Sequence, residues 1–161
     1  MESLLMPFCR WLQATPWGRD IRTSLWAYPF IQLIHFSGLS LWLATNVAGD
    51  LRLLGYGNKL QTPAEVRDGL FRWNWAGFCI AVFGGFLLFS ARATMYIRNP
   101  AFRVKLFMII PVAVLWHIFV QAKSHRWGQT QETPAVAKLA GLIELLLWVA
   151  VVAAAVEIPS Y

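Results

Sequence analysis

Charged side chains are scarce in this chain of 161 residues, because Asp, Glu, Lys and Arg together make up only 14% of it. An ordinary soluble domain carries about 25%. Hydrophobic residues reach 58%, which leaves too little polar side chain to cover a soluble globule of this size. The same composition excludes a disordered, collagenous or coiled-coil chain. Cysteine is also rare, and Cys9 and Cys79 alone exclude a disulfide-stapled scaffold. What remains is an integral membrane protein, whose first partner is the lipid bilayer.

The net charge of +6 comes from 14 basic and 8 acidic residues. In a soluble protein this excess would suggest nucleic acid. Here the basic residues lie between long apolar runs, where positive charge orients the chain and contacts anionic lipid. We therefore expect no nucleic-acid partner.

Four apolar segments are long enough to cross a bilayer as helices, since a hydrocarbon core of about 30 Å requires roughly 20 residues. They predict spans over residues 24–49, 73–97, 103–122 and 137–157. The expected fold is an all-α, integral membrane four-helix bundle that occupies residues 1–161 as a single domain.

A short interfacial helix is predicted before the first span. Leu4, Leu5, Phe8, Trp11 and Leu12 fall on one helical face, as in helices that lie in the plane of a membrane surface.

The segment between the first two spans is the longest predicted loop. We expect Asp50–Gly55 to lie along the interface, because it is too short and too charged to cross. Thr62, Pro63 and Glu65 then have the order of a capped helix start. They predict a short amphipathic helix that leads into the second span.

Two of the three histidines, His35 and His117, lie inside apolar spans. The first and third spans run parallel, and the two side chains are predicted at comparable depth. Facing imidazoles at one depth suit the iron of a b-type haem. Gly38 lies one turn after His35 and would leave room for the porphyrin, while Arg52 could meet its propionates.

Other interpretations of the histidines stay open. A membrane histidine also forms ordinary hydrogen bonds across a helix interface. Copper would use His and Met ligands, but no Met-x-Met or His-x-His pair concentrates them. Gly77, Ala81 and Gly85 form a stripe of small residues that favours close helix packing, although it would also leave room for a flat ligand.

Glu144 is the one carboxylate inside the apolar run 139–156 of the predicted fourth span. It is placed on the same side of the membrane as His117. It is expected either to pair with His117, as a partner of the haem ligand or as a proton or quinone contact, or to reach the interface.

Several motifs together resemble a known group. They are His35-x-x-Gly38, the run Asp50-Leu51-Arg52-Leu53-Leu54-Gly55, and Arg98-Asn99-Pro100-Ala101-Phe102-Arg103-x-Lys105 leading to His117. The chain resembles small bacterial four-helix membrane proteins of uncharacterised function, over most of residues 24–157. These are related in pattern to the copper-resistance D proteins and, more distantly, to cytochrome b561-type bundles.

The cytochrome resemblance implies a bis-histidine haem b, electron exchange with quinone and a redox partner protein. Only His35 and His117 match that ligand role by position. The copper-resistance resemblance implies copper passage across the bacterial inner membrane, but the methionine-rich signature is absent from this sequence.

The sequence therefore predicts a membrane b-type haem protein, with one haem on His35 and His117, that acts as an electron carrier or redox subunit. A copper or small-solute transport protein without haem is the alternative, and a structural subunit of a larger membrane complex is the third. Short loops argue against an independent enzyme. The expected location is the bacterial inner membrane.

The topology is the first testable prediction. We expect both termini in the cytoplasm, because the short stretch between the second and third apolar runs, residues 92–105, carries Arg92, Arg98, Arg103 and Lys105 with no acidic residue. A reporter fused after Tyr161 should be active only if it is of a cytoplasmic type. Activity of a periplasmic reporter at that position would reverse the orientation.

Overall fold

The computed structural model of the protein describes residues 2–57, 60–130 and 132–156, and this part of the chain is all-α. Its helices are α1 (Glu2–Ala14), α2 (Pro16–Thr23), α3 (Ala27–Leu53), α4 (Pro63–Ala91), α5 (Ala93–Arg98), α6 (Pro100–Val104), the π-helical turn η1 (Lys105–Ile109), α7 (Ile110–Trp127) and α8 (Ala135–Val156). Four segments are long and apolar enough to cross a membrane: α3, α4, the run from α6 to α7, and α8. The all-α class and the four-pass architecture are thereby confirmed.

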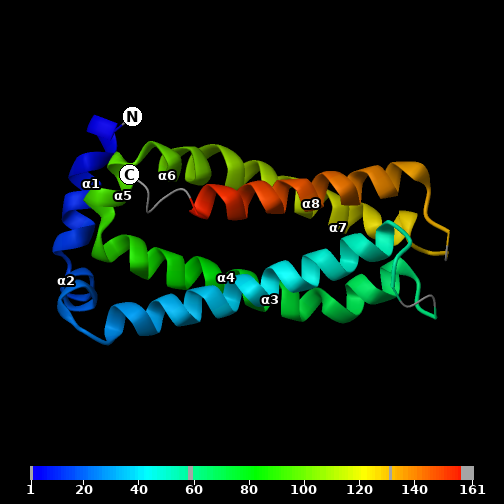
Figure 1. Cartoon of the computed structure of the whole chain (residues 1–161), viewed down its shortest axis with the longest axis horizontal. Helices are drawn as coiled ribbons and strands as arrows, with labels where there is room; N and C mark the ends of the chain where they lie inside the picture. Colours follow the sequence, from blue (N-terminus) through cyan, green and yellow to red (C-terminus); the bar gives the residue numbers. More distant parts are fainter. Residues whose placement is uncertain (1, 58–59, 131, 157–161) are drawn as a thin grey trace.

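The four long helical segments lie side by side along the long axis of the molecule (Figure 1). The short helices α1, α2 and α5 gather at one end, which we call the terminal end. The opposite end, where α3 and α7 finish and α4 and α8 begin, is the loop end.

The start of α4 follows from local chemistry. The Glu65 backbone N–H donates to Thr62 Oγ1 at 3.3 Å, and the Thr62 N–H donates to Glu65 Oε2 at 2.7 Å. Pro63 occupies the first turn, where its missing N–H costs nothing. The predicted helix start is correct, but no separate short helix follows it. The helix that begins at Pro63 continues unbroken to Ala91.

Glycines bring α3 and α4 close together. A Cβ atom at Gly77 would lie 2.7 Å from the backbone nitrogen of Trp42. A Cβ atom at Gly38 would lie 2.6 Å from the backbone nitrogen of Ala81. The small residues therefore serve helix packing, and the space beside Gly38 is filled by α4 rather than left open for a porphyrin.

The interior contains separate apolar clusters at different depths. Near the terminal end lie Cys9, Leu12, Ala93 and Ile97. In the middle lie Trp42, Ala113, Trp148 and Val151. Near the loop end lie Leu53, Val120, Ala137 and Ala140.

The outer surface of the spans is strongly apolar. Phe30, Leu33, Phe83, Leu115 and Val149 are each more than half exposed. Such a surface is expected where lipid, not water, surrounds the helices.

The end of α3 differs from the prediction. Asp50–Leu53 is not an interfacial segment but the last turn of α3, and Asp50, Arg52 and Leu53 are all buried. From the sequence, Asp50 was expected at the surface because it is a charged residue at the end of an apolar run. In the structure it is buried, because Arg67 of α4 provides a partner for its charge.

Helix bounds also differ from the predicted spans. The predicted second span, 73–97, is divided at Arg92, because α4 ends at Ala91 and α5 is a separate helix. The third helical segment extends to Trp127, five residues beyond the predicted 122. The last residue of the predicted fourth span, 157, lies outside the described residues.

The predicted N-terminal helix is present as α1, which packs on α5. Its predicted apolar face divides into two sides. Leu4, Phe8 and Trp11 are exposed, whereas Leu12 is buried against the bundle together with Cys9.

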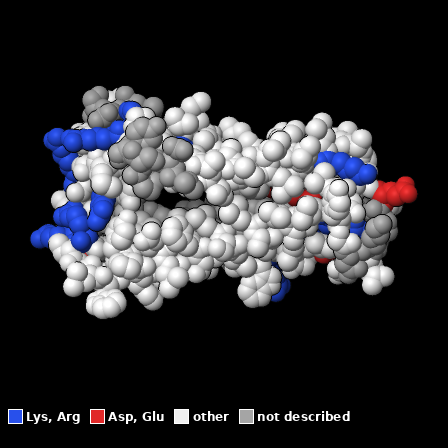
Figure 2. Space-filling model, viewed as in Figure 1, with Lys and Arg blue, Asp and Glu red and all other residues white. Residues whose placement is uncertain are grey.

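Basic side chains gather at the terminal end of the molecule, and others are visible toward the loop end (Figure 2). Acidic side chains are visible in that view only toward the loop end. The topology prediction depends on the basic stretch of residues 92–105, which lies at this terminal end.

The close contact between α3 and α4 generates a second prediction. Gly77→Ala should destabilise the bundle by about 1–3 kcal/mol, the usual cost of overpacking, because its new methyl group meets the α3 backbone. Gly69→Ala is the matched control on the same helix, where nothing lies within 4 Å of the added Cβ. It should be neutral, or stabilising by up to about 1 kcal/mol.

Thermal unfolding in detergent, followed by circular dichroism, measures both variants. Equal stability of the two would mean that α3 and α4 are not in backbone contact at Gly77.

Candidate functional site

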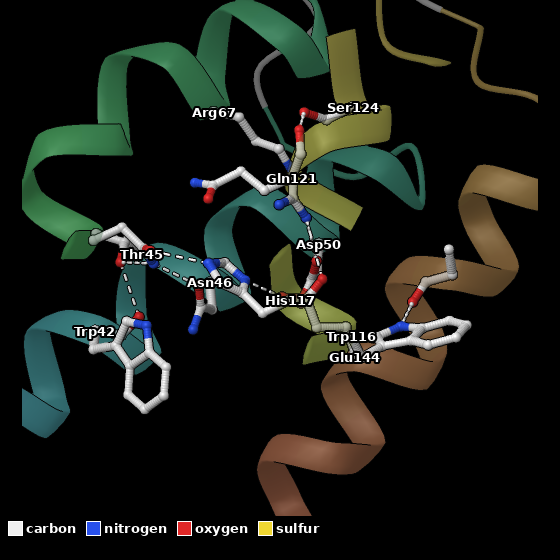
Figure 3. Close-up of polar contacts among 12 residues, drawn as sticks. Trp42, Thr45, Asn46, Asp50, Arg67, Trp116, His117, Gln121, Ser124 and Glu144 are labelled. Carbon is white, nitrogen blue, oxygen red and sulfur yellow. Dashed lines mark hydrogen bonds and ion pairs between the residues drawn. The ribbon is translucent and has the colours of Figure 1, made fainter. Parts of the chain in front are cut away.

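Seven polar side chains from all four spanning segments meet in the loop-end half of the bundle (Figure 3). Their exposed fractions range from 0% to 8%. We call this set the buried network: Thr45, Asn46 and Asp50 of α3, Arg67 and Asn74 of α4, His117 of α7 and Glu144 of α8.

Helical spacing aligns these side chains along the interior. Asn46 and Asp50 are four residues apart on α3, and Arg67 and Asn74 are seven apart on α4. Both intervals return a side chain to nearly the same helical face. Each helix therefore directs a pair of polar groups toward the bundle axis.

His117 lies at the centre of the network. Its Nδ1 is 2.5 Å from Glu144 Oε1, and its Nε2 is 3.0 Å from Asn74 Oδ1. The rings of Trp42, Trp75 and Trp148 surround the imidazole, with centroid distances of 6.5, 6.1 and 6.2 Å. Both ring nitrogens are thus engaged by protein atoms in an otherwise aromatic environment.

The Asn74 amide is oriented by α3. Its Nδ2 donates to Thr45 Oγ1 at 2.9 Å and to Asn46 Oδ1 at 2.5 Å. Since the NH₂ group is used on that side, the carbonyl oxygen is the atom that faces His117.

Two carboxyl groups share the guanidinium of Arg67. Arg67 Nη2 donates to Asp50 Oδ1 at 2.6 Å and lies 3.6 Å from Glu144 Oε2. Gly49 makes room for this side chain, because a Cβ atom there would lie 3.3 Å from both Cγ and Nε of Arg67. The arginine is therefore held flat against α3.

Some buried atoms of the network have no hydrogen-bond partner in the described part of the chain. They are Asp50 Oδ2, Glu144 Oε2, Arg67 Nε and Asn46 Nδ2. Leaving buried polar atoms unpaired costs free energy. A proton bound at this site, or a different arrangement of the hydrogen bonds, would give some of these four atoms a partner.

A pocket of about 270 Å³ opens between α4 and α7 at the loop end. Its lining includes Arg67, Gln121, Ser124 and His125. Because Arg67 belongs both to the pocket wall and to the buried network, it connects them. In the opposite direction the network meets the apolar cluster that contains Trp42 and Trp148.

His35 lies apart from the network. It is half-buried, and its Nδ1 is 2.7 Å from the carbonyl oxygen of Ala81. His117 contacts α4 at Asn74, seven residues earlier in the helix. At 1.5 Å per residue this separates the two contact points by roughly 10 Å along α4. The structure does not bring the two histidines together.

The other predicted site residues have different surroundings. Glu144 contacts His117, which is one of the two placements that the sequence left open for it. Arg52 donates from Nε and Nη2 to the carbonyl oxygen of Gln61, at 3.0 and 2.7 Å, and so holds the turn after α3. Gly38 packs on α4.

One haem held by both His35 and His117 does not fit this arrangement. Both nitrogens of His117 already have partners, and the space beside Gly38 is filled. The haem hypothesis stays a prediction, which absorption spectra of the oxidised and reduced protein test.

Sequence reasoning missed most of the network. It assigned Asp50 to the interface and gave no role to Arg67, Asn74 or Asn46. The available signal was the spacing of polar residues at helical intervals, Asn46 with Asp50 and Arg67 with Asn74. This spacing shows that each pair lies on one face of its own helix. It does not show that the face of α3 and the face of α4 meet in the bundle.

The shared guanidinium generates a third prediction. Arg67→Met should destabilise the protein by about 3–5 kcal/mol, because it leaves buried carboxylates without their cation. Removing the main partner as well, in Arg67→Met with Asp50→Leu, should recover a large part of that loss.

Unfolding in detergent measures the pair as a double-mutant cycle. Arg72→Met is the control, because Arg72 is exposed on the same helix, and it should stay within about 0.5 kcal/mol of the parent. If Arg67→Met were no more harmful than this control, the network would not depend on the guanidinium.

Comparison with known proteins adds no family to this description: no protein-family model, no curated protein and no solved structure matches the chain.

Proposed function

We propose that this protein transfers protons in a membrane, with His117 and Glu144 as the site that takes up and releases the proton. Ionisable residues inside membrane spans are rare, and chains of Asp, Glu and His in that position are typical of proton relays. Here such a chain includes Asp50, Glu144 and His117, with Arg67 at its outer end.

The charges of the network require one proton. Asp50 and Glu144 are two potential negative charges, and Arg67 supplies one fixed positive charge. An uncompensated charge at a site of this burial costs several kcal/mol. One proton on the pair formed by His117 and Glu144 makes the network neutral.

The buried contact of His117 with Glu144 carries the proposal, and the hydrogen bonds of the ring provide a place for this proton. His117 lies between two oxygen atoms, Glu144 Oε1 and Asn74 Oδ1. A neutral imidazole has only one N–H, so it cannot donate to both. The arrangement is satisfied when the ring is doubly protonated beside a carboxylate, or when Glu144 carries the proton and donates it to Nδ1.

The pocket between α4 and α7 is the proposed route to solvent. Arg67 lies in its wall and contacts both carboxyl groups of the network. Toward the terminal end the Trp42 and Trp148 rings pack at a centroid distance of 4.4 Å. Proton exchange is therefore proposed to occur at the loop end, and transfer to the other face requires a rearrangement of this aromatic layer.

Proton transfer needs no haem and falls within the transport alternative that the sequence left open. No copper ligand set is required either. The proposal uses only side chains that the structure brings into contact.

The fourth prediction concerns proton movement in liposomes. The purified protein, reconstituted with a pH-sensitive dye inside and driven by a potassium diffusion potential, should acidify or alkalise the lumen. His117→Ala and Glu144→Gln should each lower the initial rate by roughly a hundredfold, the lower range of what a positioned proton-transfer group contributes.

His35→Ala is the matched control, because it removes the other intramembrane histidine without touching the network. It should keep a rate near that of the parent. Size-exclusion profiles in detergent establish that each variant is folded. The proposal would be contradicted if the folded parent protein gave no more proton flux than protein-free liposomes. It would also be contradicted if folded His117→Ala moved protons at the same rate as the parent.

A further inference from the structure

We propose that Arg22 and Arg92 form a clamp for the phosphate group of an anionic phospholipid at the terminal end of the bundle. The two guanidinium groups would hold the phosphate between them, while the acyl chains follow the exposed side of α3 into the bilayer. The clamp lies at the opposite end of the molecule from the buried network. This inference therefore goes beyond the proposed function and does not depend on it.

The fold brings the two arginines into one region. Arg22 lies in the last turn of α2, and Arg92 is the single residue between α4 and α5. Helix α2 packs on both α3 and α4, at the end of the molecule where α4 finishes and α5 begins (Figure 1). Both arginines are exposed. Two positive charges that are far apart in the sequence thus lie on the same part of the surface.

The Arg22 side chain is held by backbone oxygen atoms. Its Nη1 donates to the carbonyl oxygen of Ala91 at 3.3 Å and to that of Gln13 at 3.5 Å. Ala91 is the last residue of α4, so Arg22 binds one of the carbonyl groups that a helix leaves unpaired at its end. The same bond places the guanidinium beside the residue that precedes Arg92. Within the described residues it leaves the N–H groups of Nε and Nη2 for a ligand.

The Arg92 side chain is held by an aromatic ring. Its Cζ lies 5.0 Å from the centroid of the Tyr28 ring, which is a cation–π distance. The Tyr28 hydroxyl is 2.8 Å from the hydroxyl of Tyr96, so the ring is fixed between α3 and α5. A guanidinium stacked on a ring face keeps the N–H groups of its edge for hydrogen bonds. Since both arginines are already positioned, a ligand loses less binding free energy to the ordering of their side chains.

Neither guanidinium has an acidic partner in the part of the chain that the structure describes. The ion pairs there involve neither Arg22 nor Arg92, although Asp20 lies on the same helix as Arg22. Other basic side chains surround them at the terminal end (Figure 2). Such a site favours an anion, and the paired N–H groups of arginine match the oxygen atoms of a phosphate.

The surroundings favour a lipid over a free anion. Trp26 and Tyr28 lie at the start of the first spanning helix, and aromatic residues in that position lie at the depth of the lipid head groups. Trp26 and Phe30, one helical turn apart, are 83% and 63% exposed. They provide an apolar surface for acyl chains next to Tyr28, on which Arg92 stacks. Basic pockets between spanning helices at this depth are typical sites for anionic head groups.

Lipid binding to the purified protein in detergent tests the clamp. Native mass spectrometry gives the affinity for phosphatidylglycerol, whose phosphate charge is uncompensated, and for phosphatidylcholine, whose head group carries its own cation. The parent protein should bind one phosphatidylglycerol at least about tenfold more tightly, because the basic surroundings repel the choline group. Thermal unfolding in the same detergent should show stabilisation by phosphatidylglycerol and none by inorganic phosphate.

Variants separate the clamp from the general charge of this end. Arg92→Gln should weaken phosphatidylglycerol binding roughly tenfold, as expected for the loss of a hydrogen bond between charged groups. Arg92→Lys keeps the charge but not the paired N–H groups, and should weaken it by about threefold or more. Arg10→Gln is the matched control, because it removes the same charge from an exposed position on α1. It should change the affinity by less than about twofold at physiological salt.

Three results would overturn the clamp. If folded Arg92→Gln binds phosphatidylglycerol as tightly as the parent, the phosphate is not held there. If Arg10→Gln loses as much affinity as Arg92→Gln, the lipid is attracted to the whole basic end and not to a site. If inorganic phosphate stabilises the protein as much as phosphatidylglycerol does, the site binds a free anion and not a lipid. None of these results bears on proton transfer, which the liposome flux measures separately.

Discussion

The sharing of one guanidinium by two buried carboxyl groups is the interaction on which the loop-end half of this bundle depends. Arg67 lies 2.6 Å from Asp50 and 3.6 Å from Glu144, and these residues come from α4, α3 and α8. The ionic contacts therefore connect three spanning helices at one point. Neither carboxylate is exposed to solvent. Each of the three helices must therefore lie where its charged side chain can reach a partner of opposite charge.

The packing between α3 and α4 makes this arrangement possible. Gly38 and Gly77 bring the two backbones together, and Gly49 leaves space in which the Arg67 side chain lies against α3. Asn74 then reaches Thr45 and Asn46, which orients it toward His117. Small residues and polar residues thus have linked roles: close backbones allow short polar contacts, and these contacts fix the register of the pair.

Sequence reasoning succeeded where a residue stood out against its own surroundings. Glu144 and His117 are ionisable residues within apolar runs, and their contact was one of the two outcomes expected from their placement on the same side of the membrane. The reasoning was wrong about Asp50, because a charge at the end of an apolar run is usually solvated. It also paired His35 with His117 by counting residues along two helices, although His35 contacts α4 at Ala81 and His117 contacts it at Asn74.

Composition and hydropathy alone determined that this protein is an all-α, four-pass membrane protein, because runs of about 20 apolar residues have few other stable states. The start of α4 at Thr62 could also be predicted from the sequence, because its cap involves only neighbouring residues. Only the tertiary structure decided which polar groups meet. Helical periodicity places Asn46 with Asp50, and Arg67 with Asn74, on one face of each helix. The rotation and vertical offset of neighbouring helices, set here by glycine contacts and by neutralisation of buried charge, determine which faces come together.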